Sequence, residues 1–167
     1  LPELTDAWVE ENFSSTDGVH TVEDLRAEYQ KMLYQNNLNT AVMDYLLANS
    51  TFKDLPKEVT DYQVNQCLNY YYTMAQYYGY DLDSFLQAAA GYNSADDLLD
   101  AMSDSITEYA REALLYQAVA EAMDIAPTQE QIDPYSAYTE TYGANYCTMV
   151  ALMDAVSEAL TTGAQVK

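Results

Sequence analysis

The side chains that could carry out catalysis are few and lie far apart in the sequence. His20 is the only histidine, and the two cysteines, Cys67 and Cys147, fall on separate predicted helices. A Ser-His-Asp or Cys-His site would need His20 beside a nucleophile, and nothing in the sequence indicates such a pair. We therefore predict no catalytic residues. We interpret His20 as a surface residue beside a turn and both cysteines as small buried apolar side chains.

Four aspartates could offer oxygen ligands to a cation, but their pattern does not predict a metal site. Asp96, Asp97, Asp100 and Asp104 cluster on one predicted helix, without an EF-hand loop and its glycine. The chain also has no Glu-x-x-His pair of the di-iron kind and no glycine loop for phosphate. We predict no metal and no cofactor, and we interpret the aspartates as a solvated helix face with a negative first turn.

The charge of the chain excludes several classes of partner. It has 27 acidic residues against 6 basic ones, for a net charge of −21. Nucleic acids and anionic lipids bind Lys and Arg, so we predict no nucleic-acid partner. No apolar run approaches the ~20 residues that a membrane helix needs, so we predict no direct membrane insertion. The negative charge does favour the solubility of a protein that exposes apolar surface.

The spacing of apolar residues predicts an all-α fold, because no segment alternates with the period of a strand. Residues 1–20 are predicted to be a lead-in linker with a short helix that Thr5 caps, and residues 21–167 the helical domain. Thr21 and Thr128 are predicted to cap helices, and Gly79 is predicted to end one. The longer helices are predicted over residues 22–48, 56–78, 95–123 and 144–160, and a short helix over residues 81–90. Pro134 and Gly143 bracket a predicted irregular, Tyr-rich connection.

The helix predicted over residues 56–78 is apolar over an unusually wide arc. Its central stripe, which ends with Ala75 and Tyr78, is predicted to face the core, and further apolar residues flank that stripe on both sides. The arc spans roughly 220°, more than twice the width that a surface helix needs to bury. Two interpretations follow: this helix is central and covered on several sides, or part of the arc faces a partner.

Tyrosine and methionine favour the second interpretation. The chain has 17 tyrosines against three phenylalanines and one tryptophan. A tyrosine ring is apolar with a polar tip that tolerates water, and thioethers adapt to different contacts. We predict a peptide-binding surface that consists of Tyr70, Met74, Tyr77, Tyr80, Tyr135, Tyr138 and Tyr142.

An ordered series of short segments carries a family resemblance. The segments are Leu1-Pro2-Glu3-Leu4-Thr5-Asp6 with Trp8-Val9, Thr21-Val22-Glu23-Asp24-Leu25-Arg26, Leu46-Leu47-Ala48-Asn49-Ser50, Leu55-Pro56-Lys57-Glu58-Val59, Arg111-Glu112-Ala113-Leu114-Leu115 with Ala118-Val119-Ala120-Glu121, Thr128-Gln129-Glu130, and Met149 to Val166. Together they resemble the C-terminal, substrate-binding domain of trigger factor, the bacterial folding chaperone. The resemblance covers nearly the whole chain.

The resemblance implies an elongated helical array with arm-like protrusions that binds unfolded or nascent polypeptides. It implies no enzyme activity in this chain, although an FKBP-type peptidyl-prolyl isomerase domain precedes this domain in the family. Residues 126–143 are shorter and more broken than the arm helices of the family, and the charge is more negative. These departures favour an extracytoplasmic relative with a secreted or lipid-anchored parent, with a cytoplasmic protein as the alternative.

Two rival functions stay open at this point. The wide apolar arc could pair with a second copy, which would make the chain a helical dimerisation or structural module without client binding. The chain could also isomerise prolyl bonds itself, but FKBP-type sites are built on a sheet and none is predicted here.

Overall fold

The computed structural model describes residues 3–13 and 15–163, so residues 1–2 and 164–166 of the resembling segments lie outside the described part. The described residues form helices and turns without a strand, which confirms the predicted all-α fold. The chain divides into two compact units. The first comprises residues 1–45 and 157–167, and the second comprises residues 46–156.

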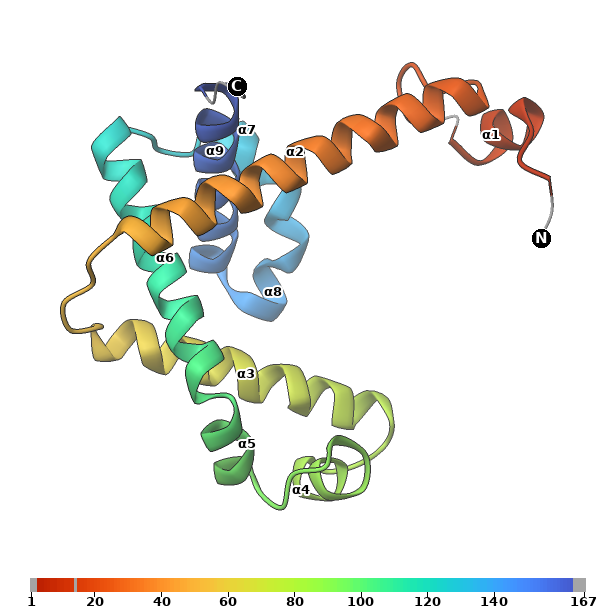
Figure 1. Ribbon diagram of the computed structural model, residues 1–167. Helices are drawn as coiled ribbons and strands as arrows, with labels where there is room; N and C mark the ends of the chain where they lie inside the picture. The colour runs from red at the N-terminus through yellow and green to blue at the C-terminus, as the bar shows by residue number, and fades with distance from the viewer. Residues whose placement is uncertain (1–2, 14, 164–167) are drawn as a thin grey trace. The chain divides into compact units, whose positions relative to one another are not determined.

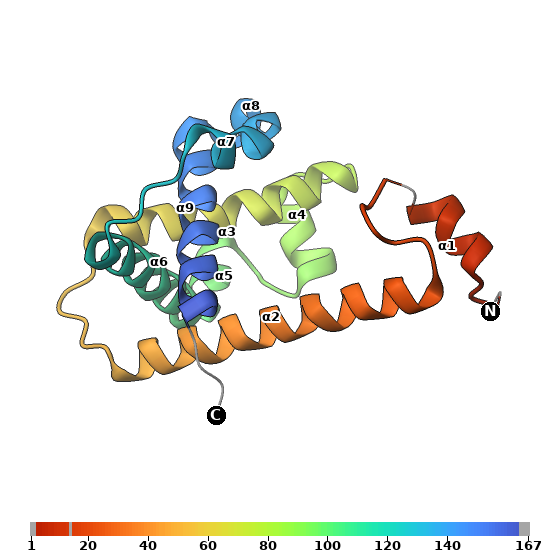
Figure 2. The same cartoon turned by 90° about the horizontal axis from the view of Figure 1, so that it is seen from above.

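The first unit joins a short helix to the start of a long one. Helix α1 (Asp6–Phe13) and the turn after it lie beside the N-terminal end of α2 (Val22–Asn49) (Figure 2). Val9, Val19 and Leu25 form a small buried core between them, with Phe13 and Val22 packed against it. This core fixes the first turns of α2.

Side-chain caps complete the N-terminal end of α2. The Thr21 hydroxyl accepts a hydrogen bond from the Asp24 amide at 3.1 Å, and the Asp24 carboxylate accepts one from the Thr21 amide at 2.9 Å. The predicted cap at Thr21 is therefore confirmed. Asp6 adds a bond from another helix, because its carboxylate accepts from the Val22 amide at 2.8 Å. Hydrogen bonds from Thr21 and His20 lower the pKa of Asp24, because they stabilise the carboxylate.

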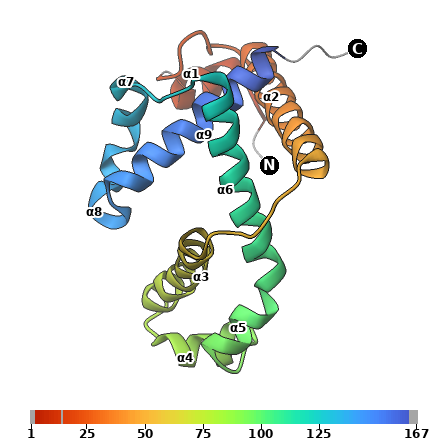
Figure 3. The same cartoon turned by 90° about the vertical axis from the view of Figure 1, so that its left-hand side faces the viewer.

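The second unit contains the remaining helices. Helix α3 contacts α4, α5 and α6, and α4 and α5 connect the C-terminal end of α3 to the N-terminal end of α6 (Figures 1 and 3). The elements are α3 (Lys57–Tyr77), α4 (Leu82–Phe85), the π-helix η1 (Leu86–Ala90), α5 (Ala95–Ala101), α6 (Ser103–Met123), α7 (Gln129–Ile132), the 3-10 helix η2 (Asp133–Tyr138), α8 (Thr139–Tyr142) and α9 (Ala144–Gly163), which ends in the first unit.

Two predicted elements are wrong in detail. The helix expected over residues 95–123 is interrupted at Met102, whose backbone (φ −95°, ψ 3°) leaves the helical region. Ser103 and Asp104 follow this break, and such short polar residues favour helix ends over helix interiors. The connection between Pro134 and Gly143, expected to be irregular, consists of the helical turns η2 and α8. The short helix predicted after Thr128 is α7, and a capping box between Thr128 and Gln131 begins it, so the predicted Thr128 cap is confirmed.

Candidate peptide-binding surface

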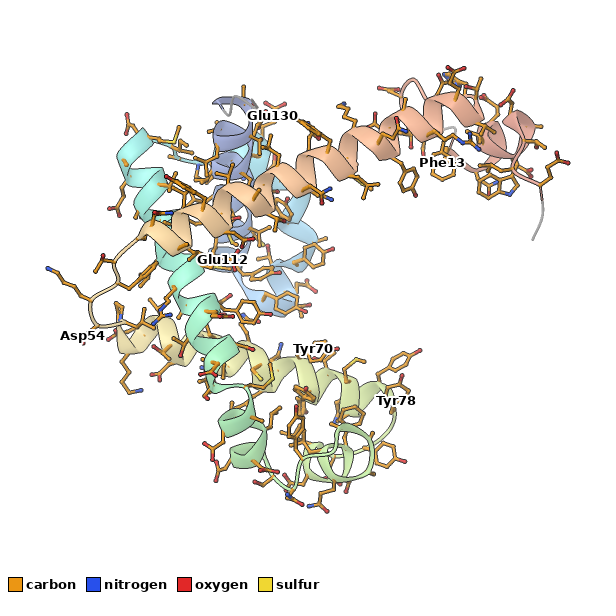
Figure 4. All side chains as sticks on the ribbon, in the orientation of Figure 1. Phe13, Asp54, Tyr70, Tyr78, Glu112 and Glu130 are labelled. Atoms are coloured by element: carbon orange, nitrogen blue, oxygen red, sulfur yellow. The ribbon has the colours of Figure 1, made fainter. Side chains whose placement is uncertain are left out.

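Helix α3 buries only one of its residues fully. Ala75 is its only fully buried residue, whereas Tyr70 is 60% exposed and Tyr77 is 80% exposed. Figure 4 shows Tyr70 midway along α3 and Tyr78 just beyond its C-terminal end. Tyr78, predicted to face the core, is 59% exposed because α3 ends there, although its ring stacks on Phe85 at 6.0 Å. The helix is therefore not enclosed.

The first of three hollows beside α3, the aromatic hollow, has a volume of about 410 Å3. Cys67, Tyr70 and Tyr71 line it together with Met102 and Ile106 at the start of the next long helix, and its other lining residues are Gln63, Gln66 and Tyr109. The ring of Tyr71 meets the ring of Tyr70 edge-on at 5.3 Å. Burial raises the pKa of the Cys67 thiol and of the Tyr71 hydroxyl, because it disfavours their charged forms. This hollow therefore suits an apolar side chain.

The second, the amide hollow, has side-chain amides in its lining and no charged residue, with a volume of about 510 Å3. Helix α3 lines it with amides and tyrosines, and α8 adds a hydroxyl and a further tyrosine. None of its nine lining residues is charged. They are Tyr62, Asn65, Gln66, Leu68, Asn69 and Tyr72 from α3, with Leu82, Thr141 and Tyr142.

The third, the central hollow, has a volume of about 220 Å3 and is lined by α3, α6 and α9. Met149 and Met153 of α9 give it two flexible thioethers, and Glu112 is its only charged lining residue. Gln66 lines all three hollows, and Tyr62 lines the central and the amide hollow. The three hollows therefore meet at Gln66.

The seven residues of the predicted surface do not share one place. Tyr70 lines the aromatic hollow and Tyr142 lines the amide hollow, while the other five line none of the three. Tyr77 projects from the end of α3, and Met74 is half-buried. Tyr80 (46%) and Tyr138 (50%) are also exposed.

The hydroxyl of Tyr135 makes a hydrogen bond within the chain. It donates a hydrogen bond to the carboxylate of Asp154 on α9. This bond raises the pKa of Tyr135, since the hydroxyl next to a carboxylate holds its proton more tightly. The residue ties η2 to α9. Tyr142, by contrast, packs beside Tyr146 with 4.7 Å between ring centroids.

The amides Asn65, Gln66 and Asn69 were missed as candidate site residues in the sequence. A signal for them exists, because Asn65, Asn69 and Tyr72 follow the i, i+4, i+7 spacing that places residues on one helix face. Polar residues at such spacing normally indicate only a solvated face. The position of α8 opposite them is not readable from that spacing.

The two cysteines and His20 differ in how far the structure buries them. Cys147 is buried, as predicted, and its thiol donates to the Tyr135 carbonyl at 3.1 Å, whereas Cys67 is only half-buried. His20 is exposed, as predicted, and its Nδ1 lies 2.8 Å from a carboxylate oxygen of Glu10. Within residues 3–13 and 15–163, no three His, Cys, Asp or Glu residues gather in a way that could hold a metal ion. None of the helices in that part combines the length and the apolar character needed to cross a membrane.

Comparison with known proteins identifies the family to which the chain belongs. The family described as the bacterial trigger factor protein (TF) C-terminus matches residues 20–158. The trigger factors of Streptococcus pyogenes serotype M5 (strain Manfredo) and serotype M49 (strain NZ131) are each 25% identical over 140 residues, which is 80% of this chain. The chain spans only 32% of the length of these relatives. No solved structure matches.

Proposed function

Since this chain belongs to the bacterial trigger factor C-terminus family, we propose that it is the client-binding module of a folding chaperone. It holds unfolded or nascent polypeptides on the α3 face and makes or breaks no covalent bond. The family match and the relatives named trigger factor support this role. Any peptidyl-prolyl isomerase activity belongs to a separate, upstream domain of a longer parent.

One observation carries the proposal. Helix α3 has 21 residues but only one of them fully buried, and it exposes large tyrosine rings beside three hollows. A folded protein that needed these rings only for its core would cover them. Exposed aromatic surface next to hollows of a few hundred Å3 is typical of a site that binds another molecule.

The strength of binding on such a surface suits reversible holding. At about 25 cal/mol per Å2, a few hundred Å2 of client surface contributes several kcal/mol before entropy costs are subtracted. The net charge of −21 keeps a protein with exposed aromatic rings from self-association. The compartment stays a prediction, either an extracytoplasmic parent or the cytoplasmic alternative.

The test is suppression of aggregation of chemically denatured citrate synthase upon dilution into buffer. We expect the full chain to lower light scattering in proportion to its concentration. The triple variant Tyr70→Ser, Met74→Ser, Tyr77→Ser should lose most of that effect while keeping its far-UV circular dichroism. Full suppression by the folded triple variant would remove α3 as the binding surface.

A matched control exists on α2. The variant Tyr29→Ser, Met32→Ser, Tyr34→Ser also replaces two tyrosines and one methionine, at positions that are 43–56% exposed. We expect this variant to suppress aggregation as well as the unchanged chain does. If instead it alone loses the effect, the client surface lies on α2 and the assignment to α3 is wrong.

The same stretch of α2 supports a second candidate function, pairing with another copy of the chain. Residues 26–37 are exposed all around the helix, and Leu33 is 54% exposed among them. Sedimentation velocity distinguishes the two functions. A dimer that dissociates in the α2 triple variant would favour a dimerisation module, whereas a monomer at all concentrations would exclude it.

A further inference from the structure

The amide hollow points to the part of a client that this module recognises. Resting on the proposed function, we propose that the amide hollow binds the main chain of an extended, uncharged client segment through the side chains of Asn65, Gln66 and Asn69. The aromatic hollow then takes an apolar side chain of the same segment. Recognition of the main chain explains how one surface accepts many sequences, because every polypeptide carries the same amide groups.

The chemistry of the lining matches a peptide bond. A side-chain amide has one carbonyl acceptor and one NH2 donor, the same groups that an unpaired peptide unit offers. Asn65 and Asn69 are exposed and stand one helical turn apart on the side of α3 that α8 faces across the hollow. An extended client strand can therefore satisfy donors and acceptors on the same helix face.

Charge decides which client segments fit. The chain carries a net charge of −21, yet the amide and aromatic hollows have no charged lining residue. A charged client group would lose its hydration in either hollow without gaining a partner charge. The occupant that matches the lining is therefore a neutral stretch of polypeptide.

The amide and aromatic hollows are adjacent, so one client segment can occupy both. Gln66 lines both the amide and the aromatic hollow, so the two meet along α3. Successive side chains of an extended peptide point to opposite faces. A strand that places its main chain against the amides can direct alternate side chains toward Tyr70 and Tyr71.

The test compares two peptides that differ only in their main chain. The probe is a fluorescein-labelled, end-capped twelve-residue peptide of Phe, Ser, Ala and Gly, and its analogue has N-methyl groups on alternate peptide bonds. Fluorescence anisotropy with the full chain gives both affinities. We expect N-methylation to weaken binding by about two- to tenfold for each hydrogen bond lost.

Protein variants separate main-chain recognition from a change in peptide shape. In the variant Asn65→Ala, Asn69→Ala the preference for the unmethylated peptide should shrink at least threefold. The matched variant Asn36→Ala, Asn37→Ala removes two exposed asparagines from α2 and should keep the full preference. An unchanged preference in the α3 variant would overturn the inference.

The remaining outcomes distinguish the two proposals. Equal binding of both peptides by the unchanged chain overturns main-chain recognition but leaves client binding on α3 intact. Binding of neither peptide, together with no suppression of aggregation, overturns the proposed function itself. Displacement of the labelled peptide by maltohexaose, lost in the Asn65→Ala, Asn69→Ala variant, would show that the hollow is a carbohydrate site instead.

Discussion

Helices α3 and α6 have the same length and pack against each other, but they use their surfaces in opposite ways. Each has 21 residues. Helix α6 buries five of them, whereas α3 buries only Ala75. The buried residues of α6 are Ile106, Ala110, Leu115, Tyr116 and Ala120.

The side chains explain this difference. Helix α6 carries alanines and branched aliphatic residues, which have no polar atom and fill a core well. The large side chains of α3 are mostly tyrosines, whose hydroxyl groups can stay in water while the rings remain available. A helix can therefore be apolar over a wide arc without being central. One helix holds the unit together, and the other offers surface.

The largest expected effect is in α6. Leu115 is 6% exposed, so Leu115→Ala should lower the free energy of unfolding by about 2–5 kcal/mol, because it removes buried contacts and leaves a cavity. Urea denaturation followed by circular dichroism measures this change. A loss below about 1 kcal/mol would show that α6 is not the core helix of its unit.

The C-terminal ends of α3 and α6 have the same backbone geometry but different residues. Both helices end on a left-handed residue, Gly79 (φ 76°) after α3 and Asp124 (φ 55°) after α6. In each case the next amide donates back to the helix at 2.8 Å, from Tyr80 to Ala75 and from Ile125 to Ala120. Only glycine adopts this conformation without strain.

Exchanging these residues should change stability in opposite directions. Gly79→Ala should cost about 1–2 kcal/mol from the backbone alone, since open space surrounds the new methyl group. Asp124→Gly should gain up to about 1 kcal/mol, because it relieves the strain and removes a negative charge from a helix C-terminus. Urea denaturation of both variants tests the pair. Changes of the same sign would contradict this account of the two helix ends.

A smaller effect should appear at high pH, and it arises from α3. Burial raises the pKa values of Cys67, Tyr62 and Tyr71. The unfolded chain therefore loses these protons first, and the free energy of unfolding falls as pH rises above their ordinary pKa values. Urea midpoints measured from pH 7 to 10.5 test this prediction. The fall should be shallower in Cys67→Ala and in Tyr71→Phe, and an unchanged slope in both would argue against it.

The smallest effect on stability is expected for the most exposed residue of α3. Tyr77 is 80% exposed, so Tyr77→Ser should change the free energy of unfolding by less than about 0.5 kcal/mol. Urea denaturation tests this in parallel with the Leu115→Ala variant. A loss of 2 kcal/mol or more would mean that the ring of Tyr77 is needed for folding, which would remove it from the binding surface.

Much of the local structure could be predicted from sequence, and the errors have a common cause. The caps at Thr21 and Thr128 and the stop at Gly79 were predicted correctly, because each depends on a residue type and its immediate neighbours. The break at Met102 was missed, since the apolar spacing continues across it. The exposure of Tyr78 was missed because periodicity assigns a face to a residue but not a neighbour to that face.

The candidate site was predictable only in part for the same reason. Tyr70 and Tyr142 could be chosen by residue type, and the structure places them in two different hollows. Asn65 and Asn69 could not be chosen, since an amide on a helix face is ordinary until another element stands opposite it. Tyr135 could not be separated from its neighbours without the position of Asp154.

The sequence by itself determined the helical fold, most of the helix ends, the negative charge and the family of this chain. These properties depend on neighbours within a few residues or on composition, so no distant contact is needed to read them. Only the tertiary structure decided that α6 rather than α3 forms the core, and that the amides of α3 border a neutral hollow. Burial depends on which elements pack on a face, and that is settled by residues far away in the sequence.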